Sequence, residues 1–258
     1  MLKKLFYVDT RTFALTVNSM NFMNIFILAY LIISCNADAL SDTNIAQAVT
    51  DWLTGGDARA TVISTYGQIE TWDTSQITSL KDVFKSTLWP ISSNPAIAGS
   101  PDLTAWDISK VTSLKDTFRD SSFNGDISTW DTGKVKSFRY AFMSNSYFTG
   151  LVGGGLANWN VSEGTDFGFI FYGASKFNGD ISKWITTKMD NLVYAFSGAT
   201  VFNSDISKWD VLSISTATEA FDGAKSYSRT ICSKKWMSSV FSSKHRLDSG
   251  LPTEAGGR

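Results

Sequence analysis

The chain has 258 residues, of which 43% are hydrophobic and 18% are charged. This composition suits a folded core and argues against a disordered chain. The formal net charge is −1 and the pI is near 5.8, so the sequence carries no basic footprint for nucleic acid or for an anionic membrane.

Residues 1–39 are predicted to be a signal peptide. Three basic residues precede an apolar run at 22–34 that is short for a membrane span. Ala37-Asp38-Ala39 matches a cleavage site and would leave Leu40 as the first mature residue. Two alternatives stay open. The residues that end at Cys35 also fit a lipobox, which would make Cys35 a lipidated first residue, and the segment could remain as an uncleaved N-terminal anchor.

Residues 40–65 are predicted to form an N-terminal helical cap that covers the first repeat. Ser41 and Asp42 can cap a helix that ends at Gly55-Gly56. The apolar stripe of this helix consists of Ile45, Val49, Trp52 and Leu53.

Residues 66–227 contain six copies of a repeat, each with a tryptophan that is followed twelve residues later by a phenylalanine. An aliphatic residue stands three positions before each tryptophan. The spacing of about 25 residues, with two insertions, is typical of a solenoid. The predicted core pairs are Trp72 and Phe84, Trp106 and Phe118, Trp130 and Phe142, Trp159 and Phe171, Trp184 and Phe196, and Trp209 and Phe221.

The positions five and eight after each tryptophan are mostly apolar, with polar residues between them. This pattern predicts one short parallel β-strand per coil, joined by turns or short helical segments. The exposed residues between the strand apolars would lie side by side and form a candidate interaction face. By register this face consists of Ser79, Ser113, Ser137, Asp166, Asp190 and Ser215.

Asn and Asp recur at the predicted corners, as in the string that runs from Phe177 to Ser182. These residue types bond nearby backbone, so we expect turn contacts there. A calcium ladder is the alternative, but only one Asp per corner recurs. An ice-binding file is a second alternative, because Thr74, Thr132 and Thr186 share one position.

Two insertions, at residues 85–101 and 150–155, are rich in Gly, Ser or Pro and are predicted to be surface loops. After residue 227 the pattern decays. We expect a degenerate C-terminal cap at 228–244 and a disordered tail at 245–258.

The strings FNGDISTWD, FNGDISKW and FNSDISKWDV, each followed at fixed distance by a segment such as VTSLKDTF, resemble the BspA-type leucine-rich-repeat surface proteins, whose repeat is also called the mycoplasma-lipoprotein type. The resemblance covers roughly residues 43–227. It implies a leucine-rich-repeat-like solenoid, secretion or surface display, and adhesion or protein binding, and it carries no catalytic residues.

The residues offer little for catalysis. The single histidine, His245, lies in the polar tail, which argues against a catalytic triad and against a histidine-rich metal site. Cys232 would be the only thiol of the mature chain, either as a half-buried cap residue or as a thiol for intermolecular pairing or reaction. Asn160 begins a glycosylation sequon, and the alternative is a corner Asn in place of Asp. We predict no enzyme activity, no cofactor and no metal.

The expected function is therefore a secreted or cell-surface interaction module that binds an unidentified protein or glycan. A structural matrix or spacer protein is the alternative, and a carbohydrate-active enzyme is a third. Nucleic acid is not expected as a partner, a membrane is expected only through the N-terminal segment, and the oligomeric state stays open.

Overall fold

The computed structural model describes residues 39–88 and 99–229. The chain divides into two contact units, Met1–Ala39 and Leu40–Arg258, and the description below concerns the second. The predicted signal peptide, most of the first inserted loop, His245, Cys232, and all but the first two residues of the predicted C-terminal cap and tail lie outside the described residues.

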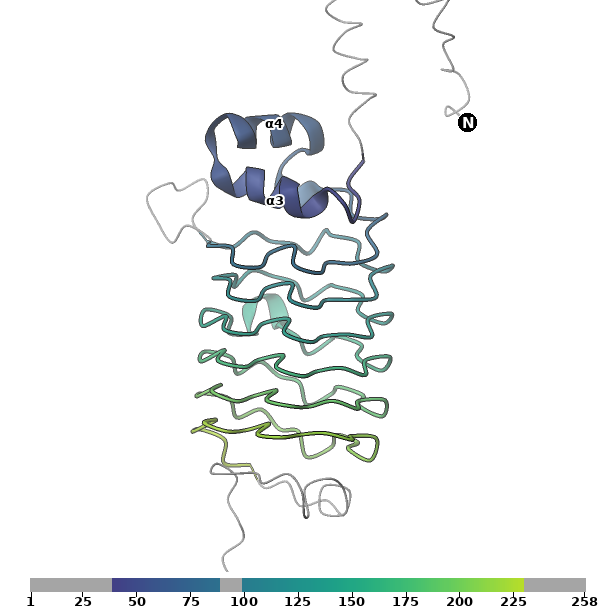
Figure 1. Ribbon diagram of the computed structural model, residues 1–258, viewed down its shortest axis with the longest axis vertical. Helices are drawn as coiled ribbons and strands as arrows, with labels where there is room; N and C mark the ends of the chain where they lie inside the picture. Colours follow the sequence, from purple (N-terminus) through teal and green to yellow (C-terminus); the bar gives the residue numbers. More distant parts are fainter. Residues whose placement is uncertain (1–38, 89–98, 230–258) are drawn as a thin grey trace, which may run out of the picture. The chain divides into compact units, whose positions relative to one another are not determined.

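Two helices begin the second unit. Helix α3, Ile45–Thr54, buries Ile45, Val49 and Trp52 and ends at Gly55, so the predicted amphipathic helix is confirmed. Helix α4, Gly56–Tyr66, follows directly (Figure 1) and was not expected. Helix α4 buries only Val62, so the sequence has no apolar stripe that would predict it. None of the helices in the described part of the chain is long and apolar enough to cross a membrane.

The predicted helix cap is wrong. The residue before α3 is Asn44, and it makes no side-chain capping bond. The carboxylate of Asp42 instead accepts hydrogen bonds from the backbone N–H of Thr78, at 2.8 Å, and of Ser79, at 3.2 Å. Asp42 therefore joins the helical segment to the first coil.

The predicted fold class is also wrong. Residues 39–88 and 99–229 contain no β-strand, so a strand-based, leucine-rich-repeat-like solenoid is not observed. Besides α3 and α4 the structure has two short 3₁₀ helices, η1 (Ile69–Thr71) and η2 (Val152–Gly154). The repeats stack as turn-rich coils (Figure 1). Neighbouring coils share isolated parallel bridges along the file Ser79, Ser113, Ser137, Asp166, Asn191 and Thr216.

The absence of strands has a cause in the backbone. Three residues after each bridge the chain takes a left-handed conformation, which ends any extended segment. These residues are Asp82, Asp116, Tyr140, Phe169, Tyr194 and Glu219, with φ between 50° and 61°.

Beyond the bridge, successive N–H groups then alternate between their own coil and the next one. Thr117 donates to Leu114 within its coil at 3.2 Å, and Phe118 donates to Ala141 of the next coil at 2.8 Å. The coils are thus joined by backbone hydrogen bonds without forming a sheet.

All twelve predicted core residues are buried, with at most 4% of any of them exposed. Each indole N–H from the second coil on also donates to a carbonyl of the preceding coil. Trp130 donates to Leu103 at 3.0 Å and Trp184 donates to Leu156 at 3.0 Å. Like rings stack on like rings, as Phe118 does on Phe142 with centroids 5.2 Å apart. One coil alone could not bury these rings.

The predicted corner bonds are confirmed. The carboxylate of Asp107 accepts the N–H of Ser109 at 2.9 Å, and that of Asp180 accepts the N–H of Ser182 at 2.9 Å. Asparagines join neighbouring coils, since the side-chain oxygen of Asn178 accepts the N–H of Asn203 at 2.8 Å. The side chains of Thr74, Thr132 and Thr186 are buried, which removes the ice-binding alternative.

Candidate functional site

The copies of the repeat differ from one another on the side of the coils that carries the bridges. We call this side the bridge face and define it as the side chains seven, nine, ten and thirteen positions after each tryptophan. Its aromatic side chains, and the charged side chains of Arg139 and Asp166, are half-buried and partly open to solvent. The bridge face includes the bridge residues and is therefore continuous with the interaction face predicted from the sequence.

Four of the six predicted interaction residues, Ser79, Ser113, Ser137 and Asp166, lie in the file of bridges. Asp190 and Ser215 do not, because they stand six positions after Trp184 and Trp209, whereas every bridge residue stands seven positions after its tryptophan. The bridges there use Asn191 and Thr216. Asp190 and Ser215 are exposed and belong to the column one residue earlier, in which the N–H of Ser215 donates to the carbonyl of Asp190 at 2.9 Å.

Three aromatic side chains form a column at the middle of the bridge face, ten positions after successive tryptophans. The aromatic column consists of Tyr140, Phe169 and Tyr194. The centroids of Tyr140 and Phe169 are 5.1 Å apart, and those of Phe169 and Tyr194 are 5.0 Å apart. Tyr172 joins the column from the side, 5.7 Å from Phe169. Sequence reasoning missed this column, although three aromatic residues where the other copies carry Asp or Glu were a readable signal.

The aromatic column is held on strained backbone. Tyr140, Phe169 and Tyr194 have φ of 60°, 60° and 54°. Bulky residues rarely adopt this conformation, and it costs about 1–2 kcal/mol per residue relative to right-handed backbone. The other coils place shorter acidic side chains at the same position, so the fold itself does not require aromatic rings there.

Arg139 links the aromatic column to the bridge file. Its guanidinium lies 4.7 Å from the ring centre of Tyr140 and donates to the Tyr140 hydroxyl at 2.9 Å. It also lies 3.6 Å from the carboxylate of Asp166, which accepts a bond from Asn191 at 2.8 Å. Burial lowers the pKa of Arg139, but the bonds to Tyr140 and Asp166 outweigh burial and raise it overall.

The column ends at an acidic residue in the sixth coil. The hydroxyl of Tyr194 donates to the carboxylate of Glu219, and this bond raises the pKa of Tyr194 above its ordinary value. Tyr194 is therefore a neutral hydrogen-bonding group at the surface.

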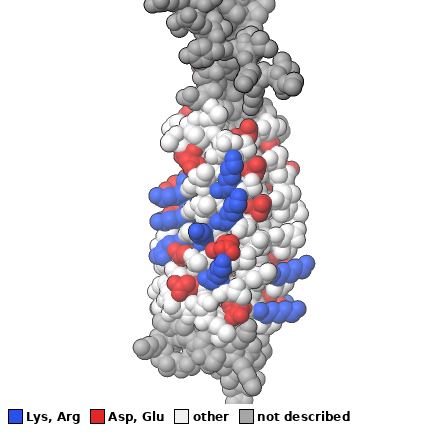
Figure 2. Space-filling model, turned by 90° about the vertical axis from the view of Figure 1, so that its right-hand side faces the viewer, with Lys and Arg blue, Asp and Glu red and all other residues white. Residues whose placement is uncertain are grey.

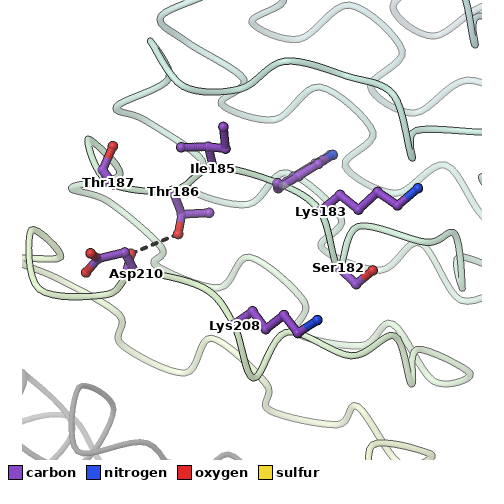
Figure 3. Close-up of a pocket in the computed structure, with 8 residues that line it drawn as sticks. Ser182, Lys183, Ile185, Thr186, Thr187, Lys208 and Asp210 are labelled. Carbon is purple, nitrogen blue, oxygen red and sulfur yellow. Dashed lines mark hydrogen bonds between the residues drawn. The ribbon is translucent and has the colours of Figure 1, made fainter.

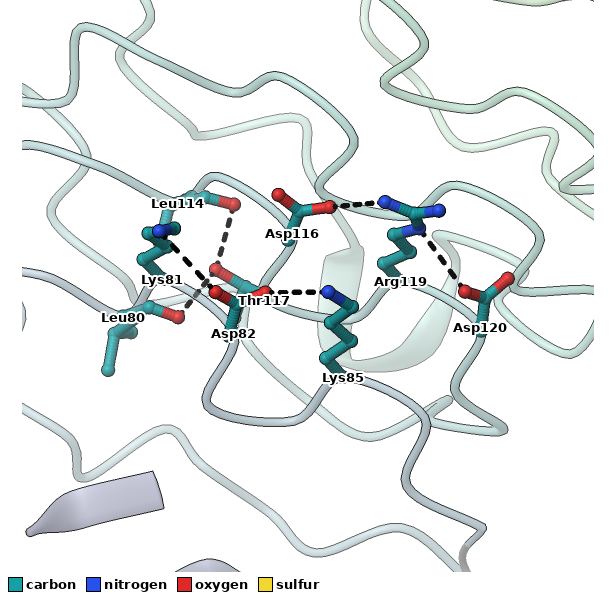
Figure 4. A network of polar contacts seen from close by, with 9 residues as sticks. All are labelled: Leu80, Lys81, Asp82, Lys85, Leu114, Asp116, Thr117, Arg119 and Asp120. Carbon is teal, nitrogen blue, oxygen red and sulfur yellow. Dashed lines mark hydrogen bonds and ion pairs between the residues drawn. The ribbon is translucent and has the colours of Figure 1, made fainter.

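The first two coils carry ion pairs on the same face (Figure 4). Lys85 lies 3.1 Å from Asp82, and Arg119 lies 3.1 Å from Asp116 and 3.2 Å from Asp120. The bond to Asp116 raises the pKa of Arg119. Figure 2 shows basic and acidic side chains interspersed on one side of the molecule.

A separate hollow lies where Ile185 replaces the corner Asp (Figure 3). It is lined by Lys183, Ile185, Lys208 and Asp210, among others, and the hydroxyl of Thr186 donates to the carbonyl of Asp210 at 2.8 Å. The side chain of Ile185 is 58% exposed. The hollow combines an aliphatic side chain with two lysines and has no cluster of catalytic groups.

The other predicted features have local roles. Asn160 is exposed, and its side-chain oxygen accepts the N–H of Ser162 at 3.1 Å, as a corner Asp would. The loop 150–155 contains η2 and exposes Leu151 and Val152. Across residues 39–88 and 99–229, no three His, Cys, Asp or Glu side chains are grouped so as to hold a metal ion.

The repeats that carry the bridge face are also the part of the chain that matches a known sequence family. The family described as "Mycoplasma protein of unknown function, DUF285" matches residues 58–153, 89–184 and 151–250. These overlapping matches together span residues 58–250, well over half of the 258 residues. A search of curated proteins gave no match, and a search of solved structures gave none. The chain therefore belongs to the DUF285 family.

Proposed function

We propose that this protein is an interaction module that binds a partner through its bridge face. The observation that carries the proposal is the aromatic column of Tyr140, Phe169 and Tyr194. Three bulky residues occupy left-handed backbone on a partly solvent-accessible face. The other three coils carry Asp or Glu at the same position. Strain of this kind clusters at functional sites.

The composition of the face supports the same conclusion. Tyr, Phe, Met and Arg are enriched in protein interfaces, and Tyr and Arg are frequent among the residues that contribute most binding energy. The bridge face gathers these types around Tyr140, with Arg139 and Met143 in the same coil and Arg119 5.5 Å from the Tyr140 ring.

The proposal includes secretion or display at the cell surface. Its support is the signal-peptide pattern of residues 1–39 and the resemblance of the repeats to BspA-type surface proteins. Mass spectrometry of the mature N-terminus tests this part. Leu40 as the first residue supports export with cleavage, a lipidated Cys35 supports surface display, and an unprocessed Met1 in a cytosolic fraction contradicts both.

Binding is tested with the full chain and a triple variant, Tyr140→Ser, Phe169→Ser and Tyr194→Ser. Each protein is labelled and applied to a glycan array. Each is also immobilised and incubated with detergent-extracted surface proteins. The wild type is expected to capture a ligand that the triple variant loses. The matched control is Tyr147→Ser, because Tyr147 is 41% exposed and lies outside the bridge face beside Lys176.

Arg139→Ala serves as a second variant that leaves the aromatic column in place, and circular dichroism checks that each protein is folded. Equal capture by the wild type and both bridge-face variants contradicts the proposal, as does the absence of any ligand, including a second copy of the chain.

A further inference from the structure

The bridge face and the positions beside it are divided by charge along the coils. This region runs from the sixth to the fourteenth residue after each tryptophan and adds Asp120, Lys136 and Asp190 to the charged residues of the bridge face. The first three coils hold six basic and three acidic side chains, a net charge of +3, and the last three hold four acidic and no basic side chains, a net charge of −4. The basic residues are Lys81, Lys85, Lys115, Arg119, Lys136 and Arg139, and the four acidic ones are Asp166, Asp190, Glu219 and Asp222.

Ion pairs within the chain do not neutralise the charge difference between the first three coils and the last three. In the first three coils the three carboxylates already have partners in their own coil, such as Asp82 with Lys85 at 3.1 Å. Of the four acidic side chains just named in the last three coils, only Asp166 has a basic partner among the described residues, Arg139 at 3.6 Å. Within that part of the chain, Glu219 and Asp222 form no ion pair. The acidic end of the face therefore offers charge to a second molecule.

The aromatic column straddles the boundary between the two halves, because Tyr140 belongs to the third coil, Phe169 to the fourth and Tyr194 to the fifth. Its rings cover one another. Phe169 has Tyr140 and Tyr194 at centroid distances of 5.1 and 5.0 Å, and Arg139 lies over Tyr140. Sugar rings bind aromatic side chains by stacking on an open ring face. In the column, neighbouring rings lie against both sides of Phe169 and the guanidinium of Arg139 lies over Tyr140, which favours a protein surface over a glycan.

We propose that the partner of the bridge face is a second copy of this chain, bound antiparallel about a two-fold axis. This inference rests on the proposed function and names its partner. In such a pair the first coil of one copy lies opposite the sixth coil of the other, and the third lies opposite the fourth. Basic coils then meet acidic coils twice, and the aromatic columns meet near the axis. A two-fold interface requires a surface that is complementary to itself in this way.

The test is sedimentation equilibrium of the full chain at low and high salt. The proposal predicts a dimer that weakens as salt rises, because exposed charges are screened. Two charge-reversed proteins sharpen the test. One carries Lys81→Glu and Lys85→Glu in the first coil, and the other carries Glu219→Lys and Asp222→Lys in the sixth.

Each reversed protein alone places like charges at both ends of the antiparallel pair, and we expect dimerisation at least about tenfold weaker than in the wild type. An equimolar mixture of the two places opposite charges at both ends again. The mixture is therefore expected to form a heterodimer of nearly wild-type affinity. Lys176→Glu, which lies outside the bridge face, is the control and should dimerise like the wild type.

A wild-type chain that stays monomeric at low salt overturns the inference, as does a dimer that neither reversed protein weakens or that the mixture fails to restore. The proposed function fails separately. If the chain is monomeric but the triple aromatic variant loses an external ligand, the face binds another protein or a glycan and only the second-copy inference is wrong.

Discussion

Trp184 joins its coil to both neighbouring coils, by ring stacking to the following coil and by a hydrogen bond to the preceding one. The indole of Trp184 is 4% exposed and lies 5.9 Å from the ring of Trp209, nearly parallel to it. Its N–H donates to the carbonyl of Leu156 at 3.0 Å. Loss of the ring would therefore leave a cavity and remove one of the two hydrogen bonds that the Leu156 carbonyl accepts, the other coming from the N–H of Trp159 at 3.1 Å.

Trp184→Ala is expected to lower the free energy of unfolding by about 3–5 kcal/mol, the usual cost of truncating a large buried aromatic residue. Urea unfolding followed by circular dichroism measures it. The neighbouring substitution Ile185→Ala is the control, and it should change stability by no more than about 0.5 kcal/mol because Ile185 is 58% exposed. A loss well under about 1 kcal/mol for Trp184→Ala would show that the ring is not part of the core.

Asp42 fixes the helical segment to the first coil, and its effect depends on pH. Burial raises the pKa of Asp42, but the bonds from the Thr78 hydroxyl and the backbone of Thr78 and Ser79 outweigh it and lower the pKa below 3.8. The carboxylate form therefore stabilises the fold above the unfolded pKa, and this contribution is lost as pH falls through the lowered folded pKa.

Asp42→Ala is expected to cost about 1 kcal/mol at neutral pH. The difference from the wild type should shrink as the pH falls below about 4. Thr43→Ala, a neighbouring exposed substitution, is the control. If the difference between wild type and Asp42→Ala is the same at pH 7 and pH 2.5, the ionised carboxylate is not the stabilising group.

The corners of the coils are repeated elements with one exception. The residue after each tryptophan accepts the N–H two residues later, as Asp131 does for Gly133 at 3.0 Å and Asp210 for Leu212 at 3.1 Å. Ile185 occupies this position in the fifth coil and has no oxygen with which to accept that bond. The hollow in Figure 3 lies at this corner.

Ile185→Asn is expected to raise the free energy of unfolding by about 0.5–1 kcal/mol, because the amide oxygen can accept the N–H of Thr187 as Asn160 accepts that of Ser162. Thermal and urea unfolding measure the change. Lys183→Asn, an exposed substitution on the other side of Trp184, should leave stability within about 0.5 kcal/mol. A variant no more stable than the wild type would mean that the corner bond contributes nothing in this coil.

The elements that repeat were predictable from the sequence, and those that depend on backbone conformation or on differences between copies were not. The Trp and Phe columns and the corner bonds recur in residue type and spacing, so the sequence identified them. The prediction of strands was wrong because a left-handed residue follows each bridge by three positions, and this residue, such as Asp116 or Tyr140, has no constant type that the sequence would reveal. Helix α4 was missed because it buries only Val62. The aromatic column was not predicted because it lies at a position where three copies depart from the shared pattern.

At the scale of the whole molecule, the corner carboxylates act together. Hydrogen bonds from the residue two positions later, Ser or Thr in each case, lower the pKa values of Asp73, Asp102, Asp107, Asp180 and Asp205. Because each pKa is lower in the folded state, the stabilisation is complete above the unfolded pKa near 3.8 and is lost as pH falls through the folded values.

The urea midpoint of the full chain should therefore fall progressively from pH 5 to pH 2. A triple variant, Asp102→Asn, Asp180→Asn and Asp205→Asn, keeps oxygens that can accept the corner bonds and removes three titrating groups. Its midpoint should depend less on pH over the same range. A wild-type midpoint that does not change between pH 5 and pH 2 would contradict the account of the corners.

The binding role of the bridge face is tested most directly by hydroxyl-radical footprinting of the full chain, with and without its bound partner. For self-association the two states are high and low protein concentration. Tyr140, Met143, Phe169, Tyr172 and Tyr194 are reactive side chains on the bridge face, and Tyr147 is an exposed aromatic residue outside it. Binding is expected to protect the bridge-face residues and to leave the reactivity of Tyr147 unchanged. Protection confined to Tyr147 and the loop 150–155, with the bridge face as reactive as before, would contradict it.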